Sequence, residues 1–446
     1  MDLFSTLSRL EVPSNRPALK NVHVRHPAKI ESAKAQVDPV RAWSSFLIRD
    51  FTLLWLSSVL TAIASQVRQV AQLYQVYEIS GSSVKLGLTG LLQGLPYVLL
   101  GLFAGTLADT FDRKKLILVT QFLNLIPPAV LGFLTMVGAV QVWHVYLFSV
   151  LSALFQVFNG PARSALVPRL VPPSHLMNAV SVTAMIHQGS MLVGPAVAGF
   201  LIDRFGVSST YFVCGGLFIP AAFGVMAIRT SGKPQGERRR VNLRSMIEGV
   251  EFIWIQRIIF SLFLLDFGVM LVGYYNAILP VFASDVFRAG ATGLGTLYTA
   301  SALGALAGLG LLLLVGDVRR KGILVLISAV PFAGSLALLG IAPWFWVGVA
   351  AVAALGFFDA ISVSIRRTVI QLLAPDAMMG RAWSLMAVFA QLTNGLGALV
   401  VGAMAAMLGA PNALLLSSIL CLVIVLAIGI AVPQLWRYRP DEKAAP

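Results

Sequence analysis

Residues 87–115 read GLTGLLQGLPYVLLGLFAGTLADTFDRKK, a long apolar run that ends in a short basic segment. No charged residue lies between Lys85 and Asp109, and about 20 apolar residues are enough for a helix to cross a bilayer. Similar runs with basic connectors follow one another along the chain, whose mean hydropathy is +0.83. Hydrocarbon offers no partner to an unpaired backbone group, so these runs must be helices. The sequence predicts an all-α membrane protein.

Twelve of these apolar stretches are long enough to span a membrane, and several exceed the required length, which predicts tilted helices. The predicted spans are 46–77, 84–107, 116–138, 142–167, 177–203, 210–228, 258–283, 293–315, 323–341, 344–371, 381–407 and 412–434.

The longest polar gap separates the sixth span from the seventh and is rich in basic residues. Its last part, up to Trp254, has the pattern of a short helix on the membrane surface. The predicted organisation is a disordered basic tail at 1–45, a six-helix bundle at 46–228, a cytoplasmic linker at 229–257, a second six-helix bundle at 258–435 and a cytoplasmic tail at 436–446.

Basic residues are distributed unevenly between the two sides of the predicted membrane. With the N-terminus inside, only Lys85, Arg204 and Arg288 of the 33 Lys and Arg lie outside. This asymmetry predicts that both termini are cytoplasmic. The net charge of +14 is then a matter of topology and of contact with anionic membrane lipids, and not of nucleic-acid binding.

The two halves of the chain carry an internal repeat with an offset of 203 residues. Matching positions include Arg163 and Arg366, Pro172 and Pro375, Gln188 and Gln391, Gly194 and Gly397, Gly199 and Gly402, and Gly206 and Gly409. Parallel six-helix repeats predict a transporter whose substrate binds between two pseudo-symmetric halves.

The segment 105–115 resembles the loop signature of the major facilitator superfamily, G-x-L-A-D-x-x-G-R-K/R. The matching residues include Gly105, Asp109, Arg113 and Lys114, while Asp112 replaces a glycine of the family pattern. Aspartate also tolerates a left-handed turn, so we expect the bend to be kept. The resemblance implies a cytoplasmic gate; a basic loop that only sets topology is the alternative.

Span five carries a second resemblance, to the antiporter motif of the same superfamily. The matching positions are Ser190, Gly194, Pro195, Ala198 and Gly199, with Ser and Ala in place of two glycines. In the family this motif accompanies exporters, whereas small residues at these spacings also serve ordinary helix packing. Residues 46–435 as a whole resemble the branch that contains the enterobactin exporter. That resemblance implies a monomer with the major facilitator fold in the inner membrane of a bacterium.

Charge inside a membrane is costly and marks function, and three of the charged side chains within the predicted spans stand out. They are Arg68 in span one, Asp266 in span seven and Asp359 in span ten. The resemblance implies that spans one, four, seven and ten line a central cavity. Asp266 or Asp359 is predicted to carry the proton, since a buried carboxylate can take up and release one. Arg68 cannot release its proton and is predicted to bind an anionic substrate group or a carboxylate. The alternative is a static salt bridge between Arg68 and an aspartate.

Several uncharged polar residues are predicted to line the same cavity. Gln72 and Gln75 follow Arg68 on one helix face at i+4 and i+7. On span four, Gln156 occupies the position of the superfamily's buried arginine, which weakens the case for the usual proton relay. The remaining predicted cavity residues are Asn159, Tyr275 and Asn276.

The sequence and the resemblance together predict a proton-coupled exporter of a small amphiphilic molecule, first of all a siderophore. Efflux of cationic drugs, with Asp266 and Asp359 as counter-charges, is an alternative, as are a lipid flippase and an importer. The sequence contains no phosphate-binding loop, metal-ligand cluster or nucleophile motif. We therefore expect no enzyme, cofactor or metal site. The expected partners are a small-molecule substrate, protons and lipids.

Overall fold

The computed structural model describes residues 43–233, 256–316, 321–373 and 376–432, without the side chains of 102–109, 257–258 and 376–384. The predictions for most of the two tails and of the linker, its surface helix included, lie outside these ranges. At Gly105 and Asp109 the structure describes the backbone alone. All described residues belong to one compact unit that begins at Arg41.

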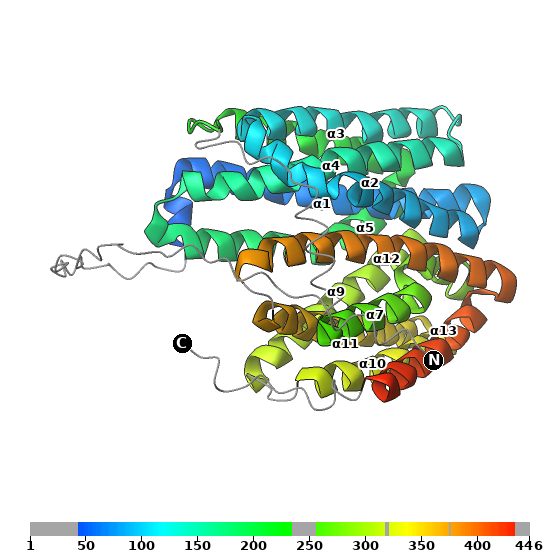
Figure 1. Cartoon of the computed structure of the whole chain (residues 1–446). Coiled ribbons are helices and arrows are strands. Elements are labelled where there is room, and N and C mark those ends of the chain that lie inside the picture. The colour runs from blue at the N-terminus through cyan, green and yellow to red at the C-terminus, as the bar shows by residue number, and fades with distance from the viewer. Residues whose placement is uncertain (1–42, 234–255, 317–320, 374–375, 433–446) are drawn as a thin grey trace, which may run out of the picture. The chain divides into compact units, whose positions relative to one another are not determined.

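The first half of the described chain consists of five long helices (Figure 1). They are α1 (Arg49–Ser80), α2 (Ser83–Thr110), α3 (Arg113–Met136), α4 (Val142–Leu170) and α5 (Leu176–Met226), with 3-10 turns at Ser44–Leu47 and Pro173–His175. The 51 residues of α5 are too many for one crossing of a bilayer about 30 Å thick. Gly206, with φ 78° and ψ 168°, interrupts the helix and divides it into spans five and six.

The second half repeats this arrangement, but its first span is broken. Helix α7 (Arg257–Gly273) ends in the 3-10 turn η3 (Tyr275–Ile278), which leads into the single turn α8 (Leu279–Val281) and the π-helical turn η4 (Phe282–Val286). The other helices are α9 (Gly290–Val315), α10 (Lys321–Gly340), α11 (Phe345–Leu373), α12 (Asp376–Leu408) and α13 (Ala410–Ala431). Eleven described segments are long and apolar enough to span a membrane. With α5 crossing twice, the prediction of an all-α protein with twelve spans is confirmed.

The backbone confirms the internal repeat. Gly206 and Gly409, which are 203 residues apart, have φ of 78° and 81°, and each separates two spans. A side chain added at Gly194 would meet Gln66 on α1, and one at Gly397 would meet Met270 on α7. Spans five and eleven therefore pack against the first helix of their own half at equivalent positions.

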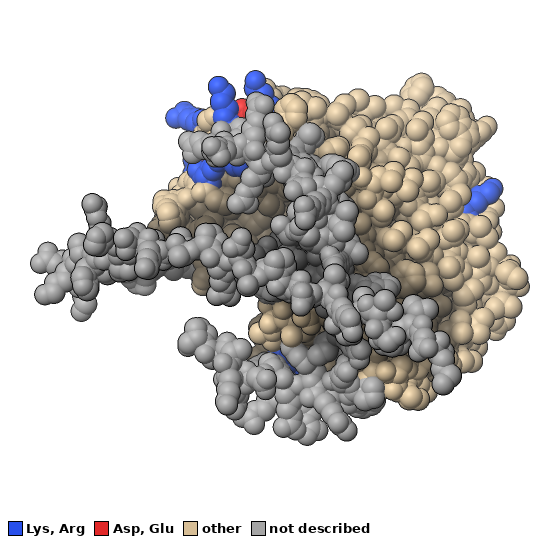
Figure 2. Space-filling model, in the orientation of Figure 1, with Lys and Arg blue, Asp and Glu red and all other residues tan. Residues whose placement is uncertain are grey.

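One end of the helices, which we call the basic end, is the end that carries Asp112, Arg113 and Lys114. The side chain of Asp112 caps α3 by accepting a hydrogen bond from the Lys114 backbone N–H at 3.0 Å. The chain bends between α2 and α3 as expected, but Asp112 has φ −62° and ψ 112°, so the bend does not use a left-handed turn at this residue. A residue that caps a helix N-terminus adopts extended angles instead. Figure 2 shows Lys and Arg side chains gathered over this end.

The opposite end, which we call the distal end, is where α1 ends at Ser80 and α2 begins at Ser83. Here two pairs of glycines bring the halves into contact, and we call them the glycine contacts: Gly199 on α5 with Gly295 on α9, and Gly402 on α12 with Gly87 on α2. A methyl group on Gly295 would lie 3.1 Å from the Cα of Gly199, and one on Gly402 would lie 3.1 Å from the Cα of Gly87. The distal end is thus closed by backbone in van der Waals contact.

A hydrogen bond between side chains adds to this closure. The hydroxyl of Tyr77, at the end of α1, donates to Oδ2 of Asp285 in η4. The bond joins the first span of one half to the first span of the other. Neither Tyr77 nor Asp285 was predicted from the sequence to have a role.

Candidate functional site

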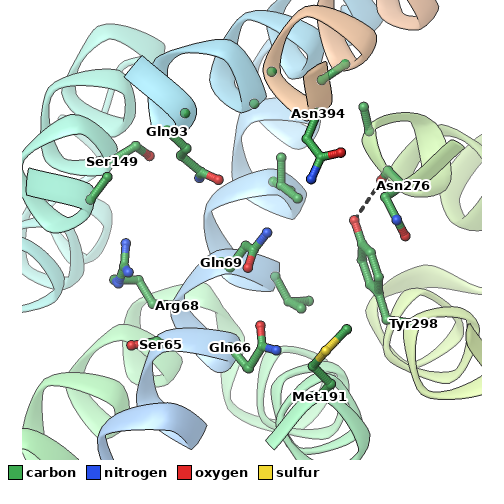
Figure 3. Close-up of a pocket in the computed structure, with 18 of the residues that line it drawn as sticks. Ser65, Gln66, Arg68, Gln69, Gln93, Ser149, Met191, Asn276, Tyr298 and Asn394 are labelled. Carbon is green, nitrogen blue, oxygen red and sulfur yellow. Dashed lines mark hydrogen bonds between the residues drawn. The ribbon is translucent and has the colours of Figure 1, made fainter. Parts of the chain in front are cut away.

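A cavity of about 590 Å³ lies between the two halves (Figure 3). Helices α1, α2, α4 and α5 line it on one side, and the break after α7 together with α9 and α12 lines it on the other. Carboxamides face it from both halves, among them Gln66, Gln69, Gln93, Asn276, Gln391 and Asn394. The cavity therefore has the size and the hydrogen-bonding capacity of a small-molecule site.

The break in the seventh span supplies part of this lining. Because the helix stops at Gly273, Tyr274, Asn276 and Ala277 reach the cavity from irregular backbone. The hydroxyl of Tyr298 on α9 donates to the carbonyl oxygen of Asn276 at 2.8 Å and holds this backbone in place (Figure 3). Discontinuous helices of this kind form substrate sites in transporters.

Three of the predicted cavity residues lie in the lining: Arg68, Gln156 and Asn276. Arg68 is the one Lys or Arg in the lining, and no described Asp or Glu is part of it. The Arg68 side chain is 7% exposed, and its Nη1 donates to Oε1 of Gln72 at 3.3 Å. The alternative of a static salt bridge is wrong for the described residues, since no carboxylate among them pairs with Arg68.

Four other predicted cavity residues lie outside the lining. Gln72 is fully buried behind Arg68, and the hydroxyl of Tyr275 is hydrogen-bonded to Ser301 at 2.8 Å. Gln75 donates to Thr135 at 2.7 Å, and Asn159 donates to Thr120 at 2.6 Å. A helix packed on two sides presents polar side chains to its neighbours as well as to a cavity.

Arg163, which the sequence showed only as a position of the repeat, is part of a partly buried polar network. Its guanidinium donates to Asn159 at 2.6 Å and to Ser58 at 2.6 Å, and also to Ser57 and Thr61 at 3.1 Å. The network joins α4 to α1. The repeat offers the signal for it, because the equivalent residue in the second half, Arg366, lies at a buried position.

The two aspartates predicted to carry protons lie in the second half and not at the cavity. Oδ1 of Asp266 on α7 forms an ion pair with Nη2 of Arg366 on α11 at 2.7 Å. Asp359 lines a separate hollow of about 10 Å³, roughly the size of one water molecule, together with Ser362 and Arg366. The charges of Arg366 and Asp266 both act on Asp359. The expectation that all three membrane charges face one cavity is therefore wrong, because α11 contributes nothing to its lining.

The loop at the basic end holds helices of the first half together. Arg113 Nη1 donates to the carbonyl oxygen of Ala165 at 3.0 Å, and Lys114 Nζ donates to that of Met226 at 3.1 Å. Arg113 and Lys114 thus bind the ends of α4 and α5. The gate role proposed for Gly105 and Asp109 stays a prediction.

The five residues of the antiporter-like motif serve close packing on α5. Gly194 adjoins Gln66 on α1, while Pro195 and Gly199 approach Gly295 on α9. Ala198 is fully buried, and Ser190 lines the cavity. The structure thus gives the motif a packing role, and its link to export stays a prediction.

Comparison with known proteins places this architecture in a family. Residues 40–440 match the family model described as transmembrane secretion effector. Macrolide efflux protein A of Streptococcus pyogenes is 25% identical over 384 residues, which cover 84% of this chain and 94% of that protein. The enterobactin exporter EntS of Escherichia coli is 25% identical over 390 residues, which cover 84% of this chain and 92% of that protein.

Solved structures show the same fold. A bacterial homologue of the human lysosomal transporter Spinster, in an inward-facing and unoccupied conformation, superposes with a TM-score of 0.70 at 16% identity. The match covers 91% of this chain and 100% of that structure. With the fold, the twelve spans and the family model in agreement, the chain belongs to the transmembrane secretion effector family of the major facilitator superfamily, whose members are transporters and not enzymes.

Proposed function

We propose that the protein is a proton-coupled secondary exporter of a small amphiphilic organic molecule. The observation that carries the proposal is the polar cavity of about 590 Å³ lined by both halves. A site shared between two pseudo-symmetric halves can open to either side of the membrane as the halves rock against each other. The names of the efflux relatives, macrolide efflux protein A and enterobactin exporter, support export over import.

The two ends of the protein fit alternating access. At the distal end the glycine contacts and the bond between Tyr77 and Asp285 hold the halves together. These contacts must separate before substrate can leave on that side. The clustering of Lys and Arg at the basic end favours an orientation with this end, and both termini, in the cytoplasm of a bacterium.

Proton coupling is assigned to the cluster of Asp266, Arg366 and Asp359. Asp266 is paired with the Arg366 guanidinium, whereas Asp359 forms no ion pair with a described residue and is acted on by the charges of Arg366, Asp266 and Arg367. A carboxylate in this situation is suited to take up and release a proton. Because α7 carries both Asp266 and the break that lines the cavity, movement of α7 connects the two sites.

The alternative of cationic drug efflux loses its physical basis in this arrangement. It requires Asp266 and Asp359 as counter-charges to the substrate. Neither lines the cavity, and Asp266 is already paired with Arg366.

The test is energised uptake into inverted membrane vesicles. Fluorescein, which is an anion at neutral pH, is the probe. Vesicles with an acidic interior should accumulate more of it than vesicles without the protein, and a protonophore should abolish the difference. Vesicles that contain the Asp359→Asn variant should accumulate it no better than vesicles without the protein. Accumulation that survives the protonophore would contradict proton coupling, and its absence from wild-type vesicles would contradict export.

A further inference from the structure

Buried polar atoms without a hydrogen-bond partner gather on α1 and α4. Nine such atoms occur in the described part of the chain. Five of them lie on these two helices: Arg68 Nε, Gln72 Nε2, Ser149 Oγ, Ser152 Oγ and Gln156 Oε1. A buried polar atom without a partner is costly, so a concentration of them marks a place where a ligand supplies the missing partners.

Three of these residues, Arg68, Ser149 and Gln156, line one wall of the cavity, and Gln72 and Ser152 are buried outside the lining. Ser149, Ser152 and Gln156 are spaced at i, i+3 and i+7 on one face of α4. Gln156 Nε2 donates to Ser65 on α1 at 2.9 Å, and Ser65 lies one turn before Arg68. Figure 3 shows the Arg68 guanidinium on the same side of the cavity as Ser149, opposite Tyr298 and Asn276.

The side chains at this wall are shielded from solvent, and no described carboxylate neutralises Arg68. Ser149, Ser152 and Gln72 are each 0% exposed, and Arg68 is 7% exposed. The ionisable side chains that act on Arg68 are Tyr97, Tyr211 and Cys214, whose phenol and thiol groups are ordinarily uncharged at neutral pH. Within the described chain, the positive charge of Arg68 is therefore left for a ligand to neutralise.

The chemistry of the atoms defines the ligand group. Arg68 Nε and Gln72 Nε2 are donors, and the two serine hydroxyls can donate as well. Only Gln156 Oε1 is restricted to accepting. The group that fits is a compact oxyanion, a carboxylate or a phenolate, with a hydroxyl or N–H beside it for Gln156.

We propose that this wall, formed by Arg68, Ser149 and Gln156 and backed by the buried Gln72 and Ser152, is an oxyanion seat that selects anionic substrates. The proposal rests on the proposed function, because it assigns the substrate class to the same cavity. The oxyanion binds in the first half, and the rest of the molecule extends toward Tyr298 and Asn276 in the second half. A substrate that bridges the halves in this way is released when the halves separate.

The test is direct binding to the purified full chain in detergent, measured by fluorescence anisotropy. Fluorescein and rhodamine 6G share a xanthene frame, but the first is an anion and the second a cation. Wild type should bind fluorescein more tightly than rhodamine 6G. Arg68→Gln should weaken fluorescein binding roughly 10- to 100-fold, because a hydrogen-bonded charge is lost, and Arg68→Lys should weaken it less.

Two serine variants provide a matched comparison. Ser149 and Ser417 are both fully buried and both have hydroxyls without a partner, but Ser417 lies on α13, away from the cavity. Ser149→Ala should weaken fluorescein binding roughly threefold to tenfold, while Ser417→Ala should leave it unchanged. Thermal unfolding shows that each variant is folded.

Three results would overturn the seat: tighter binding of rhodamine 6G than of fluorescein, binding of neither dye, or an Arg68→Gln protein that is folded and keeps wild-type affinity for fluorescein. The vesicle assay separates this failure from a failure of the exporter proposal. Loss of the seat with transport intact contradicts only the substrate class. Binding that depends on Arg68 without energised transport contradicts only export.

Discussion

The glycine contacts at the distal end predict a shift in conformation when a single methyl group is added. In Gly295→Ala the new Cβ would lie 2.5 Å from the carbonyl oxygen of Pro195 and 3.1 Å from the Cα of Gly199. Both neighbours are backbone, so no flexible side chain can move aside. Overpacking of this kind costs about 1–3 kcal/mol, and the helix propensity of alanine does not change this difference, because residue 295 stays within α9 in both states. Taking the low end of that range, we expect a loss of about 1 kcal/mol for the state closed at the distal end, or roughly a fivefold shift toward the open state.

Cysteine labelling measures this shift. Asn276→Cys places a thiol at the cavity, where a membrane-impermeant maleimide added on the distal side reaches it only when that end opens. The native Cys214 and Cys421 are 0% exposed and give little background. Labelling should be roughly fivefold faster when Gly295→Ala is added. Gly310→Ala is the matched control, because its methyl group would meet no atom within 4 Å.

The equivalent contact on the other side of the cavity extends the test. In Gly402→Ala the methyl group would lie 2.5 Å from the carbonyl oxygen of Ser83, so the same acceleration is expected. Folded Gly295→Ala and Gly402→Ala proteins that label at the rate of the Gly310→Ala control would refute the claim that these contacts close the distal end.

Three further predictions concern side chains. Asp359→Asn should abolish proton-driven accumulation of fluorescein. It should change the binding affinity for fluorescein less than threefold, or roughly 0.6 kcal/mol, because Asp359 lies outside the cavity. A large loss of affinity in the anisotropy assay would contradict the assignment of proton coupling and substrate binding to different residues. Arg366→Gln should lower the free energy of unfolding by about 3 kcal/mol, since it leaves Asp266 without its partner at 2.7 Å. Adding Asp266→Asn should recover part of that loss in chemical denaturation, and strictly additive losses would show that the pair is not coupled. Tyr77→Phe removes the hydrogen bond to Asp285 and should raise distal labelling roughly fivefold, about 1 kcal/mol, whereas wild-type labelling would mean that the bond does not hold the closed state.

The architecture of this protein could be predicted from its sequence because the bilayer imposes length and apolarity on every span. The internal repeat was equally visible, and the matching φ angles of Gly206 and Gly409 confirm it. The break after Gly273 was not predicted, since Tyr274, Tyr275 and Asn276 are compatible with a helix and only tertiary contacts decide between the two. The bond from Tyr298 to the carbonyl of Asn276 is one such contact.

The candidate site was less predictable, because a single sequence shows which residues share a helix face but not which helix that face meets. Arg68 and Gln156 were assigned to the cavity, where the structure has them, whereas Asn159 faces Thr120 on α3. The partner of Asp266 was missed because Arg366 was considered only as a position of the repeat. Its match to Arg163 in the repeat was the signal that both arginines are structural.

The central claim, that substrate movement through the cavity is exchanged for protons, is tested most directly in proteoliposomes that contain the purified protein. A pH-sensitive dye inside the vesicles reports proton movement when fluorescein is added, with wild type compared with Asp359→Asn. The account predicts proton movement that depends on the substrate in wild type and is absent in the variant. Fluorescein transport without proton movement, or equal proton movement in both proteins, would contradict it.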